Sequence, residues 1–140
     1  MTTWVVDTGP LVAYVDADDP AHTDVAARWD AFSGRLATTS AVITEAMHFV
    51  SASPEGPRTL ADLVAASGMD VFDLSAPPEL HEAVALMEKY ADTPMDFADA
   101  TLVLLVEALD ARDVLTLDRR GFAAYRTRKG RAMRLVLDAG

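Results

Sequence analysis

The sequence predicts an α/β fold in which helices cover both faces of a parallel sheet, so that the layers form a three-layer sandwich. Short runs rich in β-branched and aromatic residues alternate along the chain with longer segments of helical periodicity, and this alternation is typical of a parallel sheet. The 140 residues are 51% hydrophobic and 24% charged, a composition and length that suit one domain with a substantial core. We therefore expect a single domain over residues 1–140.

Five segments have strand character, and helical segments lie between them. The first strand, residues 3–6, is followed by the turn-like residues Asp7, Thr8, Gly9 and Pro10. The other expected strands are residues 36–39, 70–74, 114–117 and 135–137.

The helices are predicted from the spacing of their apolar residues and from the residues at their ends. Ser40 is a plausible N-cap, Gly68 can end a helix, and the two prolines at 77 and 78 fit a first helical turn. The expected helices are residues 22–32, 40–50, 58–66, 77–90 and about 96–111.

Acidic residues follow two of the strands and begin one helix. Asp7 comes directly after the first strand and Asp118 directly after the fourth. Ligands of open parallel sheets bind beyond the carboxyl ends of the strands, so both carboxylates should reach the same rim. Asp96 and Asp99 are three residues apart at the start of a helix, and they should therefore lie on one side of its first turn.

Glu45 lies in a helix that is apolar nearly all round. Such helices are usually buried, and a glutamate inside one is rare unless it has a partner. Helical side chains lean toward the N-terminus, so the Glu45 carboxylate could reach the same rim as the other acids. Alternatively, Glu45 could belong to a polar stripe with Thr44, His48 and Ser51 that faces water.

The other acids also have purely structural explanations. Asp7 could stabilise a turn, and Asp96 could cap a helix with Asp99 as its partner in the first turn. Asp118 could cap a short helix that follows it. A conjunction of four such residues at one rim is nevertheless better explained by one site than by four separate coincidences.

A cluster of carboxylates needs either protonation or a cation. Two carboxylates about 4 Å apart repel each other by roughly 4 kcal/mol at an effective dielectric constant of 20, and a domain is stable by only about 5–15 kcal/mol. An all-oxygen set of Asp and Glu suits Mg²⁺ or Mn²⁺ better than zinc. We therefore favour a divalent metal ion at this rim.

One or two carboxylate-bound Mg²⁺ ions can support phosphodiester hydrolysis without a covalent nucleophile. The chain has no cysteine, no Gly-x-Ser-x-Gly elbow and no Walker phosphate loop, and its histidines are scattered at His22, His48 and His81. Thr8 and Thr116 stand beside the acidic residues and could orient bound water there.

The charge of the chain is unevenly distributed. Residues 1–110 hold 19 acidic and 4 basic residues, net −15, whereas residues 111–140 hold 3 acidic and 8 basic residues, net +5, which gives the overall −10. The basic portion could meet an anionic partner or could be a solvated surface.

Four segments together resemble the acidic motifs of PIN-domain ribonucleases. They are residues 5–11 (VVDTGPL), 39–45 (TSAVITE), 97–101 (FADAT) and 115–122 (LTLDRRGF). Their order and the chain length are most similar to VapC-type toxins of bacterial toxin–antitoxin pairs. The resemblance implies a PIN-like parallel sheet of five strands and an endoribonuclease that depends on Mg²⁺ or Mn²⁺.

The resemblance also assigns roles to individual residues. Asp7, Glu45, Asp99 and Asp118 match the four acidic positions of the family, and these residues would be both catalytic and metal-binding. Asp96 has no equally firm counterpart and is expected to be an auxiliary ligand or a cap.

We also expect contacts with RNA from the segment after Asp118, and protein partners of the kind that the family has. Arg119 and Arg120 could contact the phosphates of an RNA substrate. The family implies a small antitoxin protein that covers the site, and frequent homodimers.

The cytoplasm is the expected location. The longest apolar run, residues 102–106, is too short for a membrane span, and no secretory signal is evident at the start of the sequence. The absence of cysteine fits a reducing compartment.

Two other functions remain open at this level. A PIN-like binding module could hold a metal or a protein partner without turnover. An aspartyl-phosphate phosphatase would use Asp7 as nucleophile, but it would normally need a second aspartate at the position of Gly9.

Overall fold

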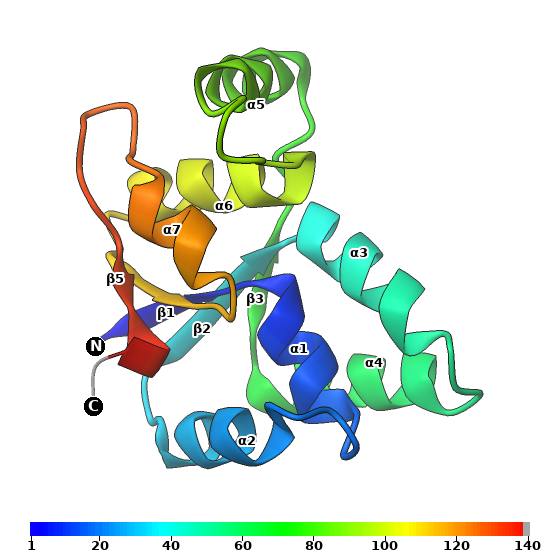
Figure 1. Ribbon diagram of the computed structural model, residues 1–140. Helices are drawn as coiled ribbons and strands as arrows, with labels where there is room; N and C mark the ends of the chain where they lie inside the picture. The colour runs from blue at the N-terminus through cyan, green and yellow to red at the C-terminus, as the bar shows by residue number, and fades with distance from the viewer. Residues whose placement is uncertain (139–140) are drawn as a thin grey trace.

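Five parallel strands form one sheet in the computed structural model, which describes residues 1–138 (Figure 1). The strand order is β3-β2-β1-β4-β5, and each neighbouring pair is parallel. The strands are β1 (Thr3–Val6), β2 (Arg35–Thr39), β3 (Asp70–Phe72), β4 (Asp113–Leu115) and β5 (Arg134–Leu135). The chain places β2 and β3 on one side of β1 and later adds β4 and β5 on the other, so the strand order reverses beside β1.

Seven helices and one 3₁₀ turn surround the sheet in the described residues. They are α1 (Thr8–Val15), α2 (His22–Ala31), α3 (Ser40–Val50), α4 (Gly56–Ser67), α5 (Pro77–Lys89), α6 (Phe97–Ala108), α7 (Arg119–Ala124) and η1 (Val136–Asp138). Figure 1 shows α6 and α7 above the sheet with α5 outside α6, and α1, α2 and α4 below it. The three-layer α/β arrangement and the parallel five-stranded sheet are confirmed.

The central strands and α6 contribute completely buried residues to the core. Val5 and Val6 on β1 and Val114 and Leu115 on β4 are completely buried. Helix α6 packs against β1 and β2 and is itself buried along most of its length, from Ala100 to Val106. This buried helix therefore has a fixed position on the sheet, and its N-terminal end carries two of the predicted acidic residues, Asp96 and Asp99.

The first strand continues into a helix without the predicted turn. Asp7 is the N-cap of α1, which begins at Thr8, and Gly9 and Pro10 are helical residues. Proline is tolerated there because the N–H groups of a first turn have no partner within the helix. The turn expected at residues 7–10 is therefore wrong.

Other boundaries also differ from the predicted ones. Thr39, rather than Ser40, is the N-cap of α3, because its side chain accepts a hydrogen bond from the N–H of Val42. Strand β3 stops at Phe72 instead of residue 74. The predicted strand over residues 135–137 is a two-residue strand followed by the turn η1, and α6 ends at Ala108.

The fourth strand is shifted toward the N-terminus of its predicted range. Strand β4 covers Asp113–Leu115, so that Leu117 lies beyond the sheet and is 40% exposed. Asp113 belongs to the strand, and its carboxylate is paired with Arg134 on β5. Within residues 1–138, no helix combines the length and the apolar character that a membrane crossing requires.

Candidate active site

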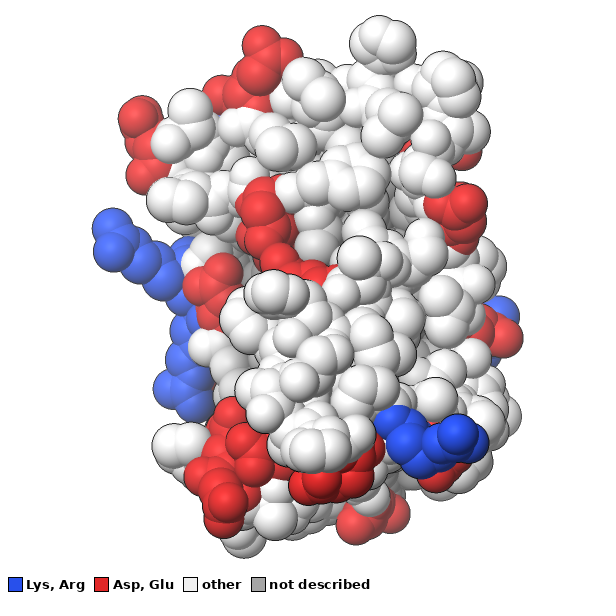
Figure 2. Space-filling view, turned by 90° about the vertical axis from the view of Figure 1, so that its right-hand side faces the viewer, with Lys and Arg blue, Asp and Glu red and all other residues white. Residues whose placement is uncertain are grey.

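A pocket of about 500 Å³ lies where β1 and β4 end, and all five predicted acidic residues line it. Asp7 follows β1, Asp118 follows the β4 segment, Asp96 and Asp99 begin α6, and Glu45 lies in the second turn of α3. The remaining lining residues are Thr8, Gly9, Val12, Asp19, Phe49 and Leu117. Figure 2 shows acidic side chains gathered in a hollow near the middle of this face of the molecule.

Asp7 is the most firmly held of these carboxylates. One of its oxygens accepts a hydrogen bond from the N–H of Thr8 (2.8 Å), and the other accepts one from the hydroxyl of Thr116 (2.7 Å). The residue is 6% exposed. Burial raises the pKa of Asp7 and the charges of Asp118 and Asp96 add to this, although the two hydrogen bonds partly oppose the change.

Thr116 connects Asp7 to Asp118. Its hydroxyl donates to Asp7 and accepts a hydrogen bond from the N–H of Asp118 (3.0 Å). Because a hydroxyl can donate one hydrogen bond and accept another at the same time, Thr116 fixes both groups. The sequence predicted that Thr116 would orient water; the structure shows it positioning these two acidic residues.

Asp118 begins α7 and remains exposed. Its side chain accepts a hydrogen bond from the N–H of Gly121 (3.0 Å), so the predicted capping role is confirmed. A Cβ atom on Gly121 would lie 2.4 Å from an Asp118 carboxylate oxygen and 3.0 Å from the hydroxyl of Tyr125. Gly121 therefore leaves the space that the Asp118 carboxylate occupies.

Asp96 and Asp99 cap the first turn of α6 reciprocally. The N–H of Asp99 donates to the Asp96 carboxylate (2.8 Å), and the N–H of Asp96 donates to the Asp99 carboxylate (3.1 Å). Burial raises the pKa of Asp99 to about 8, and the charges of Asp96 and Asp7 contribute to the increase. The predicted cap is confirmed, and both side chains also face the pocket.

Glu45 lies in the pocket rather than on a solvent-facing stripe. Thr44, His48 and Ser51 are exposed, whereas Glu45 is half-buried and lines the cavity. Burial raises its pKa and the charges of Asp96 and Asp7 act in the same direction, whereas the neighbouring Thr8 side chain opposes the change. The apolar residues around Glu45 in the sequence were therefore a useful signal of its inward position.

Three of the acidic residues are N-caps of different helices. Asp7 caps α1, Asp96 caps α6 and Asp118 caps α7. The N-terminus of a helix carries a partial positive charge that favours nearby anions. This charge offsets part of the mutual repulsion that the carboxylates experience in one pocket.

The pocket has the chemistry of a site for a hard cation, although its acids are not arranged as a ready set of ligands. Within residues 1–138, no three Asp, Glu or His side chains converge closely enough to form a metal centre. The donors are nevertheless all oxygens, and the pKa values of Asp7, Glu45 and Asp99 are raised. The hydroxyl oxygen of Thr8 is buried at the pocket without a hydrogen-bond partner in that part of the chain. A divalent cation fits this donor set.

The sequence did not identify several residues of the pocket. Asp19 lies in the loop between α1 and α2, where its carboxylate accepts a hydrogen bond from the N–H of Ala21 (2.8 Å). Phe49 is 55% exposed and lies one helical turn after Glu45, a spacing that could have identified it. Val12 and Leu117 form apolar parts of the wall.

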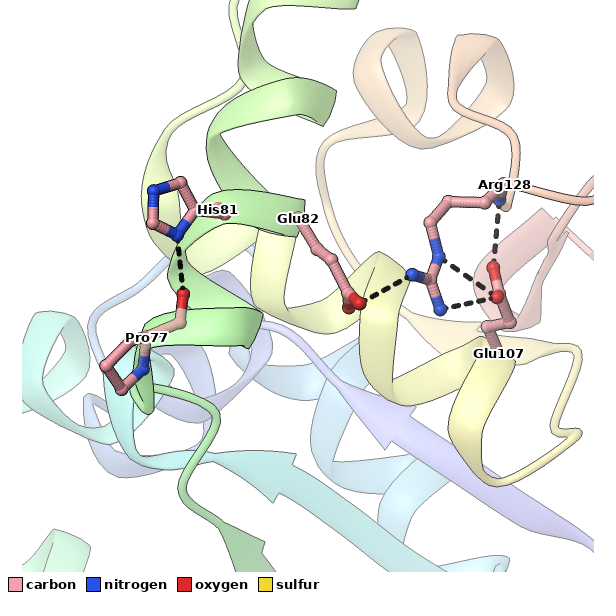
Figure 3. Close-up of polar contacts among 5 residues, drawn as sticks. All are labelled: Pro77, His81, Glu82, Glu107 and Arg128. Carbon is pink, nitrogen blue, oxygen red and sulfur yellow. Dashed lines mark hydrogen bonds and ion pairs between the residues drawn. The ribbon is translucent and has the colours of Figure 1, made fainter.

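Four of the eight basic residues of the C-terminal segment form ion pairs within the part of the chain that the structure describes. Arg128 contacts Glu82 on α5 and Glu107 on α6, as Figure 3 shows. Arg119 pairs with Asp138, Arg131 with Asp110 and Arg134 with Asp113. Among the residues that the structure describes, Arg120 forms no ion pair and is exposed beside Asp118.

Comparison with known proteins identifies related sequences and folds. The PIN domain family matches residues 4–127. Ribonuclease VapC26 of Mycobacterium tuberculosis (strain ATCC 25618 / H37Rv) is 32% identical over 124 residues, which cover 87% of this chain and 91% of the relative.

Solved structures share the fold at lower identity. The crystal structure of VapC20 from Mycobacterium tuberculosis, a sarcin-ricin loop cleaving toxin, has a TM-score of 0.74 at 19% identity, covering 88% of this chain and 95% of that one. The DNA-bound VapBC from Salmonella typhimurium has a TM-score of 0.65 at 18% identity, covering 96% and 98%. Because the family match spans most of the residues that build the sheet and the acidic pocket, the chain belongs to the PIN-domain family and is of the VapC type.

Proposed function

We propose that this protein is a divalent-metal-dependent endoribonuclease and that it is the toxin of a toxin–antitoxin pair. The observation that carries the proposal is the pocket in which Asp7, Glu45, Asp99 and Asp118 come together at the ends of β1 and β4. The similarity to a curated ribonuclease supports RNA as the substrate. Residues 1–140 would act as one PIN domain.

Asp7, Glu45, Asp99 and Asp118 would hold one or two Mg²⁺ or Mn²⁺ ions, with Asp96 as an auxiliary ligand. A bound ion of this kind lowers the pKa of water and stabilises the negative charge of a departing oxygen. The chain itself contributes the positions of the oxygens. Thr116 and the N–H of Thr8 hold Asp7 in one orientation, and Thr116 also holds the backbone of Asp118.

Asp96 and Thr8 have supporting roles in this proposal. Asp96 keeps the first turn of α6 in place, and with it the carboxylate of Asp99. The unpartnered hydroxyl of Thr8 can hydrogen-bond a water molecule or a substrate oxygen in the pocket. Arg119 and Arg120 directly follow Asp118, are exposed and would contact RNA phosphates.

The partners of the protein would be an RNA substrate, a cognate antitoxin and a second copy of the chain. Two structural neighbours are VapBC proteins bound to DNA, which supports an antitoxin partner. The activity would take place in the cytoplasm, where its RNA substrate is found.

Cleavage and ion binding should be measured separately to test the proposal. Purified protein is incubated with structured RNA in Mg²⁺, Mn²⁺ or EDTA, and Mn²⁺ binding is measured by calorimetry. We expect endonucleolytic products only with the metals, and loss of both cleavage and Mn²⁺ binding in Asp99→Asn. Asp62→Asn is the matched control, because Asp62 is exposed on α4 and lies outside the pocket.

The outcome distinguishes an enzyme from a silent binding module. Mn²⁺ binding without RNA cleavage under any condition would favour a PIN-like module that binds a metal or a partner. Cleavage that persists in EDTA would contradict the metal dependence.

A further inference from the structure

A second pocket of about 510 Å³ adjoins the candidate active site. Glu45 and Asp96 line both pockets, so these two side chains form a shared boundary of the two cavities. The second pocket lies between the start of α3, the segment after β3 and the start of α6. Its lining residues are Ser40, Ala41, Thr44, Glu45, Ser75, Asp96, Phe97 and Ala98.

The walls of this pocket suit a flat and uncharged group. Ala41, Phe97 and Ala98 provide apolar surface, and no Lys, Arg or His lines the cavity. A phosphate would meet the carboxylates of Glu45 and Asp96 without a basic side chain to balance its charge. A nucleobase has no charge and can pack its face against an aromatic ring such as that of Phe97.

Each of the three hydroxyl groups of the pocket already donates a hydrogen bond within the protein. Thr44 donates to the backbone carbonyl of Ser40 (2.9 Å), and Ser40 (3.2 Å) and Ser75 (2.5 Å) both donate to the carboxylate of Asp73. A hydroxyl has one proton and two lone pairs, and neither a carbonyl nor a carboxylate can donate in return. These side chains therefore offer only acceptors to a bound group.

Backbone N–H groups at two helix starts are the donors that the lining residues of the pocket can still offer. Ser40 and Ala41 begin α3, and Phe97 and Ala98 begin α6. The first N–H groups of a helix have no carbonyl partner within that helix. Every nucleobase carries an acceptor that such an N–H can serve, so these groups do not select among the bases. A base amino group can donate to the hydroxyl acceptors, whereas the C4 carbonyl of uracil presents only another acceptor at the same place on the ring.

We propose that this second pocket binds the nucleobase next to the phosphodiester that is cut, and that it favours a base with an exocyclic amino group over uracil. Thr44, Ser40 and Ser75 accept hydrogen bonds from the amino group, and Phe97 packs against the ring. The inference rests on the proposed ribonuclease function, because only an RNA strand in the first pocket brings a base to the second.

Cytidine and uridine are matched probes, because they differ only at the amino or carbonyl group of C4 and at the adjacent ring nitrogen. The metal-free protein is titrated with each nucleoside while the backbone amide signals of Ala41, Phe97 and Ala98 are followed by NMR. We expect these signals to shift saturably with both nucleosides. The affinity for uridine should be about fivefold lower than the affinity for cytidine, which is the effect expected from one hydrogen bond. Equal affinity for the two nucleosides, or no shift with either, would overturn the proposal.

Substitution of a hydroxyl tests which side chain selects the base. Thr44→Val keeps the shape of the side chain and removes its acceptor, so the preference for cytidine should largely disappear. Thr59→Val is the control, since Thr59 is also exposed and donates to the carbonyl four residues earlier, but on α4. A preference that survives in Thr44→Val, Ser40→Ala and Ser75→Ala alike would contradict the assignment.

Cleavage assays separate this inference from the ribonuclease proposal. RNAs that differ only in the bases on either side of a cut position are compared by kcat/KM. If the wild-type protein cuts with no base preference on either side, the pocket assignment fails and the ribonuclease function stands. If no RNA is cut while the nucleoside preference is observed, the ribonuclease proposal fails on its own.

Discussion

At the scale of single residues, the acidic side chains of the pocket differ in how firmly the fold holds them. Asp7 is buried and accepts two hydrogen bonds, whereas Asp118 is exposed and accepts one within its own cap. Asp99 is half-buried and shares a reciprocal cap with Asp96. Asp7 therefore provides the fixed reference point, around which the other carboxylates would adjust if an ion bound as proposed.

The two aspartates of α6 allow a direct comparison. We expect Asp99→Asn to lower metal-dependent cleavage by at least about 100-fold, because even groups that only support a metal ligand contribute 10- to 100-fold. We expect Asp96→Asn to lower it by about tenfold or less. Asparagine is as good an N-cap as aspartate at position 96, and at position 99 it keeps an oxygen that can accept from the N–H of Asp96, so both variants should keep α6. Rates are measured under single-turnover conditions with Mn²⁺.

Circular dichroism of both variants provides the control for folding. If Asp96→Asn abolishes cleavage as completely as Asp99→Asn while both remain folded, the two residues have equal roles and the ranking is wrong.

The raised pKa of Asp99 predicts a pH dependence for the stability of the metal-free protein. The pKa of Asp99 is about 8 in the folded protein, against a reference value of 3.8. Between pH 3.8 and about pH 8, the folded state therefore binds more protons than the unfolded state. Stability must therefore fall as pH rises through this window, and the loss is complete above about pH 8. The pKa values of Asp7 and Glu45 are raised as well, which adds to the same trend.

Thermal unfolding in EDTA between pH 5 and pH 9 measures this effect. The melting temperature should decrease as pH rises, and the decrease should be smaller in Asp99→Asn and in saturating Mn²⁺. The lowered pKa values of Glu107 and Asp73 act in the opposite direction but only below about pH 4.5, outside this range. A melting temperature that rises steadily from pH 5 to pH 9 in EDTA would contradict the prediction.

The sequence identified the acidic residues of the pocket because each has a simple local signal. Asp7 and Asp118 follow strands, Asp96 and Asp99 have the spacing of a cap, and Glu45 is surrounded by apolar residues. The hydrogen bond from Thr116 to Asp7 spans 109 positions, and no local pattern specifies such a contact. Asp19 was missed for the same reason, because its loop reaches the pocket only through the packing of α1.

At the scale of elements, α7 is connected to the start of α6 through Tyr125. The Tyr125 side chain is completely buried, and its hydroxyl donates to the carbonyl of Pro94 (2.6 Å), two residues before Asp96. The ring packs edge-on against Phe122 and Tyr90. Because Asp118 caps α7, Tyr125 helps to set the spacing between Asp118 and the two aspartates of α6.

Removal of this hydroxyl should weaken both stability and ion binding. We expect Tyr125→Phe to lower the free energy of unfolding by about 1 kcal/mol and the Mn²⁺ affinity by about tenfold. Urea unfolding and calorimetry measure the two effects. Tyr14→Phe is the matched control, because the Tyr14 hydroxyl donates to Asp30 (2.6 Å) in an exposed pair away from the pocket. If the two variants bind Mn²⁺ equally well, Tyr125 has no role in the spacing of the acids.

The order of the elements could be predicted from the sequence, whereas several of their ends could not. Strand and helix patterns alternate clearly, and Gly68 does end α4 in a left-handed conformation with φ of 67°. The ends of β4 and β5 depend instead on partners that are distant in the sequence, such as the contact of Asp113 with Arg134. Strand order likewise depends on pairing across the sheet, where β1 neighbours β4.

At the scale of the whole molecule, four of the eight basic residues of the C-terminal segment pair with carboxylates, and two of these four pair with the acidic part of the chain. Arg128 links α5 and α6 through Glu82 and Glu107, and the latter interaction lowers the pKa of Glu107 although its burial would raise it (Figure 3). Arg131 pairs with Asp110, and Arg134 with Asp113. The net charge of −10 would repel RNA at long range, so attraction must come from the few cations near the pocket.

Arg119 and Arg120 are the cations that can supply this attraction, since they directly follow Asp118 and are exposed. We expect the charge reversal of both residues to glutamate to weaken RNA binding and to reduce the slope of log Kobs against log salt by about 1, because each phosphate contact contributes about 0.7 for single strands.

Binding of RNA to the double variant is measured in EDTA to prevent cleavage. Arg131→Glu is the control, because Arg131 pairs with Asp110 and does not line the acidic pocket. Of the two residues, Arg120 should contribute more, because Arg119 is already paired with Asp138. A salt slope that is the same in the double variant and in the wild-type protein would show that RNA phosphates do not reach these two arginines.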